Sequence, residues 1–131
     1  MSSIESLLRQ DVWAVVGLSN DQSRAAYEVA AFLQARGKRI VPIHPRAEVV
    51  YGEQGYPRLA DVPFGVDVVD CFVRSGLVGP VVADAVAAGA KGVWMQLGVV
   101  DETAAAMARA AGLEVVMDHC PVIQWPAHGP R

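Results

Sequence analysis

Residues 12–44 read VWAVVGLSNDQSRAAYEVAAFLQARGKRIVPIH, and this stretch decides the fold. Its first five residues form a short apolar run, rich in β-branched side chains, of the kind found in buried strands. Apolar residues then recur with helical spacing from 24 to 36, and Gly37 stands where a helix C-cap favours glycine. A second apolar run at 39–44 follows, so the stretch predicts a strand, a helix and a second strand.

The same alternation of strand and helix continues along the rest of the chain. We expect strands at 66–73, 92–96 and 114–117, and helices at about 78–89 and 101–111. The Gly- and Pro-rich residues 45–65 predict a long connection, with one short helix at 58–62 at most. The tail from Asp118 onward shows no clear periodicity and is expected to be irregular.

The strands read as continuous apolar runs rather than as alternating ones, which is typical of strands that helices cover on both faces. We therefore predict one α/β domain over residues 1–131, with its core at about 5–124. Its expected architecture is a Rossmann-like, doubly wound, five-stranded and mainly parallel sheet with helices on both faces. Right-handed crossovers favour the strand order 3-2-1-4-5.

Composition excludes several classes of protein. With 53% hydrophobic and 19% charged residues, the chain is too apolar to be disordered. Its apolar runs are broken by Gly and Pro well short of the roughly 20 residues that a membrane helix needs. A net charge of -3 argues against broad nucleic-acid binding. The start of the chain lacks a signal-peptide pattern and the two cysteines form no CxxC, so we expect a cytoplasmic protein with reduced thiols.

The loop after the first strand is the strongest candidate for a binding site. In an open α/β sheet, ligands bind beyond the carboxyl ends of the strands. Gly17 allows a sharp turn there, and Ser19, Asn20 and Ser23 offer hydrogen-bond donors beside the start of a helix. Free amides and the helix dipole make such a position suitable for phosphate.

The same loop argues against a typical NAD site. Of the expected G-x-G-x-x-G pattern it keeps only Gly17, and the second strand ends in His44 where an acid would hold the ribose. Arginines instead follow the first three strands, at Arg24, Arg46 and Arg74. Because arginine binds phosphate oxygens in a bidentate manner, this set favours a nucleotide with several phosphates, of which one could be on the ribose.

Three segments resemble the stand-alone CoA-binding proteins, which are similar to the N-terminal CoA-binding domain of the succinyl-CoA synthetase alpha subunit. They read AVVGLSNDQSRAAYEVAAFLQARGKRIVPIHPR, VDVVDCFVRS and GVWMQLGVVDETAAAMARAAGLEVVMDHC. The resemblance covers about residues 5–124 and implies a Rossmann-like domain that binds coenzyme A at the loop after the first strand. It implies no reaction, because the phosphorylated histidine of the synthetase belongs to a later domain.

The resemblance also implies a set of residues for each part of the ligand. The phosphates would be held by the first loop, at Gly17, Leu18, Ser19 and Arg24. Val41 and Pro42 would flank the adenosine. Phe72, Val73 and Arg74 would line the pocket where the nucleotide meets the pantetheine arm. Gln96 and Gly98 would lie toward the thiol end.

Other readings of the chain remain open at this point. The leading one is a non-enzymatic protein that binds coenzyme A or an acyl-CoA non-covalently. The alternatives are a small acyl-CoA-dependent enzyme or thiol-exchange protein that uses Cys120, and an NADP-binding redox regulator. We expect no metal site, no catalytic trio from the consecutive residues 118–120, and no acid pair from Asp67 and Asp70, which alternate across a strand. Trp125 is expected to fold back onto the domain, although a homodimer contact through this tail stays open.

Overall fold

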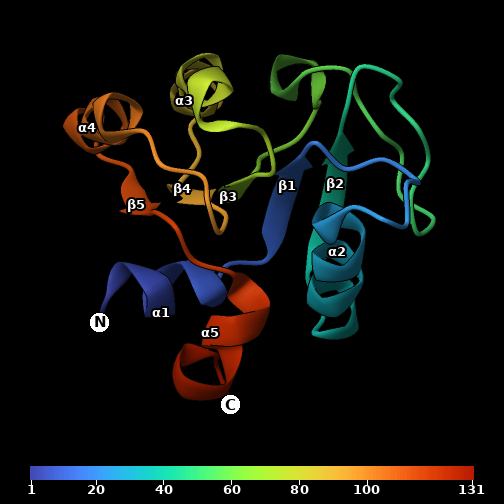
Figure 1. Cartoon of the computed structure of the whole chain (residues 1–131), viewed down its shortest axis with the longest axis horizontal. Helices are drawn as coiled ribbons and strands as arrows, with labels where there is room; N and C mark the ends of the chain where they lie inside the picture. The colour runs from blue at the N-terminus through green and yellow to red at the C-terminus, as the bar shows by residue number, and fades with distance from the viewer.

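A five-stranded, all-parallel sheet forms the centre of the computed structural model, which describes residues 1–131 (Figure 1). The strands are β1 (Val12–Val16), β2 (Arg39–Ile43), β3 (Val68–Cys71), β4 (Gly92–Met95) and β5 (Glu114–Val116). The helices are α1 (Ser3–Leu8), α2 (Ala25–Ala35), α3 (Val78–Ala87), α4 (Glu102–Ala110) and α5 (Pro121–His128). Two short 3-10 helices, η1 (Leu59–Asp61) and η2 (Ser75–Leu77), complete the fold.

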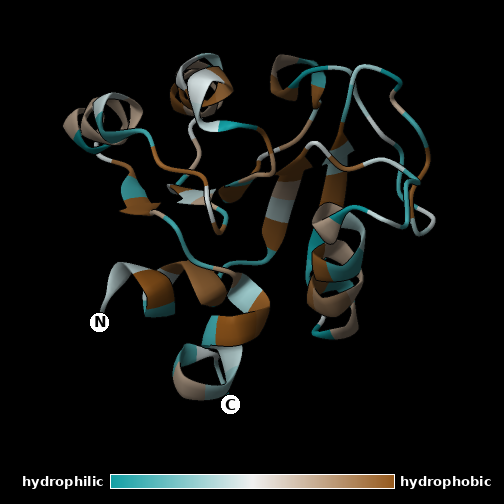
Figure 2. Cartoon of the chain, viewed as in Figure 1, coloured by the Kyte–Doolittle hydropathy of each residue, from teal (hydrophilic) through white to brown (hydrophobic).

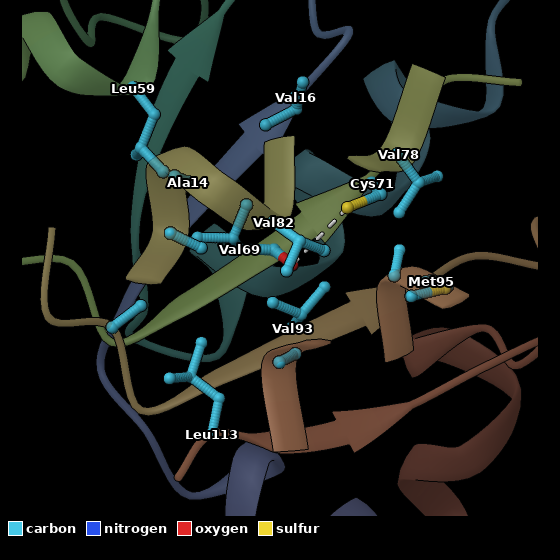
Figure 3. Close-up of a cluster of buried hydrophobic side chains, with 14 of the residues drawn as sticks. Ala14, Val16, Leu59, Val69, Cys71, Val78, Val82, Val93, Met95 and Leu113 are labelled. Atoms are coloured by element: carbon cyan, nitrogen blue, oxygen red, sulfur yellow. Dashed lines mark hydrogen bonds between the residues drawn. The ribbon is translucent and has the colours of Figure 1, made fainter. Parts of the chain in front are cut away.

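The helices cover both faces of the sheet, as the apolar strands predicted. In Figure 1, α3 and α4 lie on one face, and α1, α2 and α5 lie on the other. The core on the α3–α4 side includes Ala14, Val69 and Val93 (Figure 3), and the core on the opposite side is built around Trp13 and Trp94. The strands are mostly brown or pale in Figure 2, as expected of strands that are buried on both faces.

The predicted strand order was wrong: the order is β2-β1-β3-β4-β5 rather than 3-2-1-4-5. β3 pairs with β1, where the Asp67 amide donates to Val12 O at 2.9 Å and the Val12 amide donates to Asp67 Oδ2 at 3.0 Å. The point at which the chain reverses direction across the sheet therefore lies between β1 and β3, and ligands bind at such a crevice.

No further strand lies beside β2, because the connection that follows β2 is hydrogen-bonded to its outer edge. The Tyr56 amide donates to Pro42 O at 2.9 Å, and the His44 amide donates to Tyr56 O at 3.1 Å. The 44–67 connection thus occupies this edge itself. Since Pro42 turns its carbonyl outward, its missing N–H also faces this edge and could not serve another strand.

The tail, which was expected to be irregular, is helical in part, and a helix that was not expected lies near the N-terminus. Residues 121–128 form α5, whose first residue is a proline, and Trp125 packs edge-on against Phe32 at 5.8 Å. α1 was not predicted, because it has six residues and only one apolar pair to indicate it; a capping box between Ser2 and Glu5 begins it. Both termini lie on the side of the molecule where α1 packs on α5 (Figure 1).

The remaining differences are small. Strand pairing at β3 covers Val68–Cys71 rather than the whole of 66–73, and the short helix expected at 58–62 is η1. The longest helix, α2, has 11 residues, and none of the five α-helices combines the length and apolarity that crossing a membrane requires.

Candidate functional site

A cavity of about 690 Å³ opens at the carboxyl ends of β2, β1, β3 and β4. This volume falls within the range of small-molecule sites. Its walls come from the loops that follow these four strands and from the first turn of α2. The lining residues are Val16, Gly17, Arg24, Ala25, Ala26, Ile43, His44, Pro45, Pro57, Phe72, Val73, Arg74, Leu77, Gln96, Leu97 and Val99.

Gly17 lines the cavity directly after β1, beside the end of β3. Its amide donates to Ile43 O at 2.7 Å, and its φ of +102° belongs to a region that L side chains rarely adopt. A Cβ at this position would lie 2.7 Å from the carbonyl oxygen of Phe72. Two independent constraints, backbone conformation and space, therefore require glycine at this turn.

The N-terminus of α2 opens onto the cavity without a side-chain cap. Arg24 is the N-cap residue and has extended backbone angles, but no side chain accepts a hydrogen bond from the first turn. Ala25 and Ala26, the first two helical residues, line the cavity wall. Their backbone amides and the positive end of the helix dipole are therefore available to an anion.

No acidic side chain lines the cavity, and its two charged side chains are arginines. Arg24 and Arg74 line it, neither has a carboxylate within 4.0 Å, and no Asp or Glu belongs to the lining. Arg46 differs, because it lies outside the lining and its Nε is 3.9 Å from Glu48 Oε2. The Nδ1 of His44 accepts a hydrogen bond from the Arg46 amide at 3.2 Å, so the neutral imidazole keeps its proton on Nε2.

Gln96 brings an unsatisfied polar group to the far end of the cavity, at β4. Its side chain lines the cavity but is only 6% exposed, and Oε1 has no hydrogen-bond partner. A buried carboxamide oxygen without a partner is costly, and a donor from a bound ligand would remove this cost.

The predicted site residues divide into two groups. Those that line the cavity are Gly17, Arg24, Phe72, Val73, Arg74 and Gln96. Those that lie outside the lining are Leu18, Ser19, Asn20, Ser23, Val41, Pro42 and Gly98. The involvement of the second group in binding stays a prediction.

Residues of the second group serve the fold in identifiable ways. Asn20 Nδ2 donates to Val49 O at 2.9 Å, and Ser23 Oγ donates to Asp21 Oδ1 at 2.6 Å. Leu18 is fully buried against α2, and Val41 belongs to the core on the opposite face. Ser23 is therefore engaged within the loop after β1, Asn20 is bonded to the 44–67 connection, and the apolar pair is covered by protein.

The prediction missed several of the lining residues. His44 was noted at the end of the second strand, but neither it nor the adjacent Pro45 was assigned to the site, although their place in the chain was sufficient to find them. Leu77, Leu97 and Val99 also line the cavity, and their position after β3 and β4 is the only signal the sequence offers. Pro57 could not have been found, because the path of a long connection is not readable from its composition.

The two cysteines and residues 118–120 do not belong to the cavity lining. Cys120 is buried at the N-cap of α5, and burial raises the pKa of the other thiol, Cys71, well above its ordinary value. Asp118 accepts a hydrogen bond from Gly98, whereas His119 Nδ1 is 3.4 Å from Gln124 Nε2, so residues 118–120 do not converge. No three His, Cys, Asp or Glu side chains are placed together to hold a metal ion.

Comparisons with known proteins identify similar sequences. The model of a family described as "CoA binding domain" matches residues 11–126. The uncharacterized protein YneT of Bacillus subtilis is 32% identical over 116 residues, which cover 88% of this chain and 86% of YneT. The alpha subunit of an ADP-forming acetate–CoA ligase from Pyrococcus furiosus is 32% identical over 81 residues, which cover 61% of this chain but only 18% of that subunit.

Solved structures share the fold along nearly the whole chain. A hypothetical protein from Pyrococcus horikoshii superposes with a TM-score of 0.91 at 32% identity, over 98% of this chain and 92% of that one. A protein from Thermus thermophilus superposes with a TM-score of 0.88 at 27% identity, over 96% and 98% of the two chains. A dinucleotide-forming acetyl-coenzyme A synthetase from Ca. Korarchaeum cryptofilum reaches a TM-score of 0.75 at 28% identity, over 88% of this chain and 28% of that one.

Proposed function

The chain belongs to the CoA-binding domain family, and from this premise we propose that it binds coenzyme A, or a thioester of it, in the cavity at the carboxyl edge of the sheet. One observation carries the proposal. The cavity has two arginines without carboxylate partners and no acidic lining residue, and the uncapped start of α2 opens into it. A cavity of this composition attracts a ligand with more than one phosphate group.

Three side chains that line the cavity can donate hydrogen bonds to such a ligand. Arg24 follows β1, His44 follows β2 and Arg74 follows β3, so the groups sit on three neighbouring loops. We assign the diphosphate to the amides of α2 together with Arg24, because a helix N-terminus and a guanidinium both prefer phosphate oxygens. We assign the ribose phosphate to the end of β2, where His44 replaces the acid of a NAD site.

We also propose that the chain performs no covalent step on the ligand. The cavity lining contains no Ser, Thr, Cys, Lys, Tyr, Asp or Glu, so His44 is its only side chain of a kind that serves as a nucleophile in covalent catalysis. This composition favours a protein that holds its ligand over one that exchanges thiols through Cys120.

Isothermal titration of the wild-type protein and of Arg24→Ala with CoA, dephospho-CoA, NAD and NADP tests the proposal. CoA should bind, and Arg24→Ala should weaken its affinity by about 10-fold or more, because a hydrogen bond to a charged group contributes about 1.5–3 kcal/mol. Dephospho-CoA should bind more weakly than CoA because it lacks the ribose phosphate.

Arg109→Ala is the matched control, since Arg109 is an exposed arginine in the last turn of α4 and lies outside the cavity. It should leave the affinity for CoA unchanged. Equal losses in both variants would show that net charge, rather than the cavity, governs binding. Tighter binding of NADP than of CoA would contradict the assignment of the ligand.

A further inference from the structure

Three large aliphatic side chains are exposed to solvent at the end of the cavity nearest β4. Leu77, Leu97 and Val100 are 46%, 54% and 43% exposed, and we call these three residues the apolar rim. Leu77 and Leu97 line the cavity itself, and Val100 adjoins the lining residue Val99. Large aliphatic side chains exposed together at the mouth of a cavity indicate a surface that a partner covers.

The apolar rim is held in place rather than left mobile. The Val99 amide donates to Gln96 O at 2.8 Å, and Gly98 has a φ of +80°, as in a type II turn with Leu97 at its first corner. The Gly98 amide donates to Asp118 Oδ1 at 2.8 Å. A contact made by a side chain on such a fixed turn loses little conformational entropy on binding.

A hydrogen bond also joins the two loops that carry the apolar rim. The Val100 amide, after β4, donates to Ser75 Oγ, after β3, at 3.0 Å. Leu77 and Leu97 therefore belong to one surface, although 20 positions separate them in the sequence.

The cavity lining changes from cationic near β2, β1 and β3 to mainly apolar near β4. Arg24, His44 and Arg74 lie on the loops after β1, β2 and β3, whereas Gln96, Leu97 and Val99 follow β4. A ligand whose phosphates occupy the cationic part must therefore extend its other end past Gln96 toward the apolar rim. A free thiol at that end would leave the rim uncovered.

We propose that the physiological ligand is a CoA thioester whose acyl group is apolar and longer than acetyl, and that this acyl chain covers the apolar rim. The inference rests on the proposed function, because it assumes that the phosphates bind at the α2 end. Gln96 would then mark the boundary between the two parts of the ligand, with its carboxamide hydrogen-bonded to the polar arm.

A chain-length series tests the inference. We would titrate the protein with CoA, acetyl-CoA, butyryl-CoA, hexanoyl-CoA and octanoyl-CoA below their micelle-forming concentrations. A fully buried methylene contributes up to about fourfold in affinity, so on this half-open rim we expect affinity to rise about twofold per methylene beyond acetyl. Leu97→Ser should flatten the series, so that the ratio of the octanoyl-CoA affinity to the CoA affinity falls toward one.

Met107→Ser provides the control for non-specific adhesion of acyl chains. Met107 is 41% exposed on α4 and lies outside the cavity, so its substitution should keep the chain-length dependence intact. Hexanoate alone should not bind, since it lacks the phosphate groups.

The outcomes separate this inference from the proposed function. If CoA binds with an affinity that does not depend on the acyl chain, the inference is wrong and the proposed function stands. If no CoA compound binds, both are wrong. If Leu97→Ser leaves the series unchanged but alters the oligomeric state in size-exclusion chromatography with light scattering, a second copy of the chain covers the rim and the inference is overturned.

Discussion

Asp70 lies at the centre of β3, between Val15 of β1 and Trp94 of β4, and is fully buried. Neither carboxyl oxygen has a hydrogen-bond partner. Burial therefore raises the pKa of Asp70 well above its ordinary value, because the charged form is poorly solvated there. The folded protein keeps this proton over a pH range in which the unfolded chain has already lost it.

This difference predicts a dependence of stability on pH. For Asp70, the folded state binds more protons than the unfolded state above the ordinary pKa of about 3.9, so its contribution to the free energy of unfolding falls by up to about 1.4 kcal/mol per pH unit. The fall continues until pH passes the raised pKa of the folded state. In Asp70→Asn the side chain at this position cannot ionise, so this contribution to the free energy of unfolding should not fall with pH.

Urea unfolding of the wild type and of Asp70→Asn at about pH 5 and about pH 7 measures the effect. From about pH 5 to about pH 7, the free energy of unfolding of Asp70→Asn should rise relative to that of the wild type by about 1 kcal/mol or more. Parallel pH profiles would mean that Asp70 ionises equally in both states. Other acids affect both proteins alike and cancel in the difference.

Gly17 offers a second prediction for a single residue. Gly17→Ala should lower the free energy of unfolding by more than the roughly 1–3 kcal/mol typical of a residue forced into positive φ, because its Cβ would also meet Phe72 O. Gly112→Ala is the control, since Gly112 has a φ of +88° but no atom within 4 Å of its would-be Cβ. Equal losses of stability in urea unfolding would show that the contact with Phe72 O is easily relieved.

Among the helices, α5 depends most clearly on aromatic packing. Trp125 meets the Phe32 ring of α2 edge-on, and the Arg36 guanidinium lies 3.4 Å from the centroid of Phe32. Lys38 Nζ lies 5.7 Å from the Trp125 ring. The tail thus folds back onto the domain through Trp125, as its apolar sequence suggested, and it does so as a helix.

Trp125→Ala should destabilise the protein by about 1–3 kcal/mol, less than a fully buried tryptophan would, because the ring is half-buried. Since no residue of α5 lines the cavity, the affinity for CoA should not change under conditions where the variant is folded. Thermal unfolding and titration with CoA measure the two effects. Ile123→Ser, on the same helix and 61% exposed, should alter neither. A loss of CoA affinity in folded Trp125→Ala would show that α5 supports the cavity after all.

At the scale of the whole molecule, the sequence predicted the parts better than their arrangement. The apolar runs and glycine caps located all five strands and the helices at α2, α3 and α4, because these signals are local. The strand order depended on the Tyr56 contact with Pro42 and on the pairing of Asp67 with Val12, which are contacts between distant residues. Residues such as Gly17 and Arg24 were found for the same local reason as the strands. Leu97 could be placed near the cavity only by its position after β4, whereas Pro57 lines it because of the path of the 44–67 connection, which the sequence does not show.

The placement of the two chain ends has a practical consequence. Because α1 and α5 carry both termini on one side, away from the carboxyl ends of the strands, another polypeptide can be joined at either end without obstructing the cavity (Figure 1). The aligned region of the Pyrococcus furiosus ligase subunit is itself part of a much longer polypeptide. This geometry suits the domain to fusion with a fluorescent reporter or an enzyme, because the cavity would stay open to solvent.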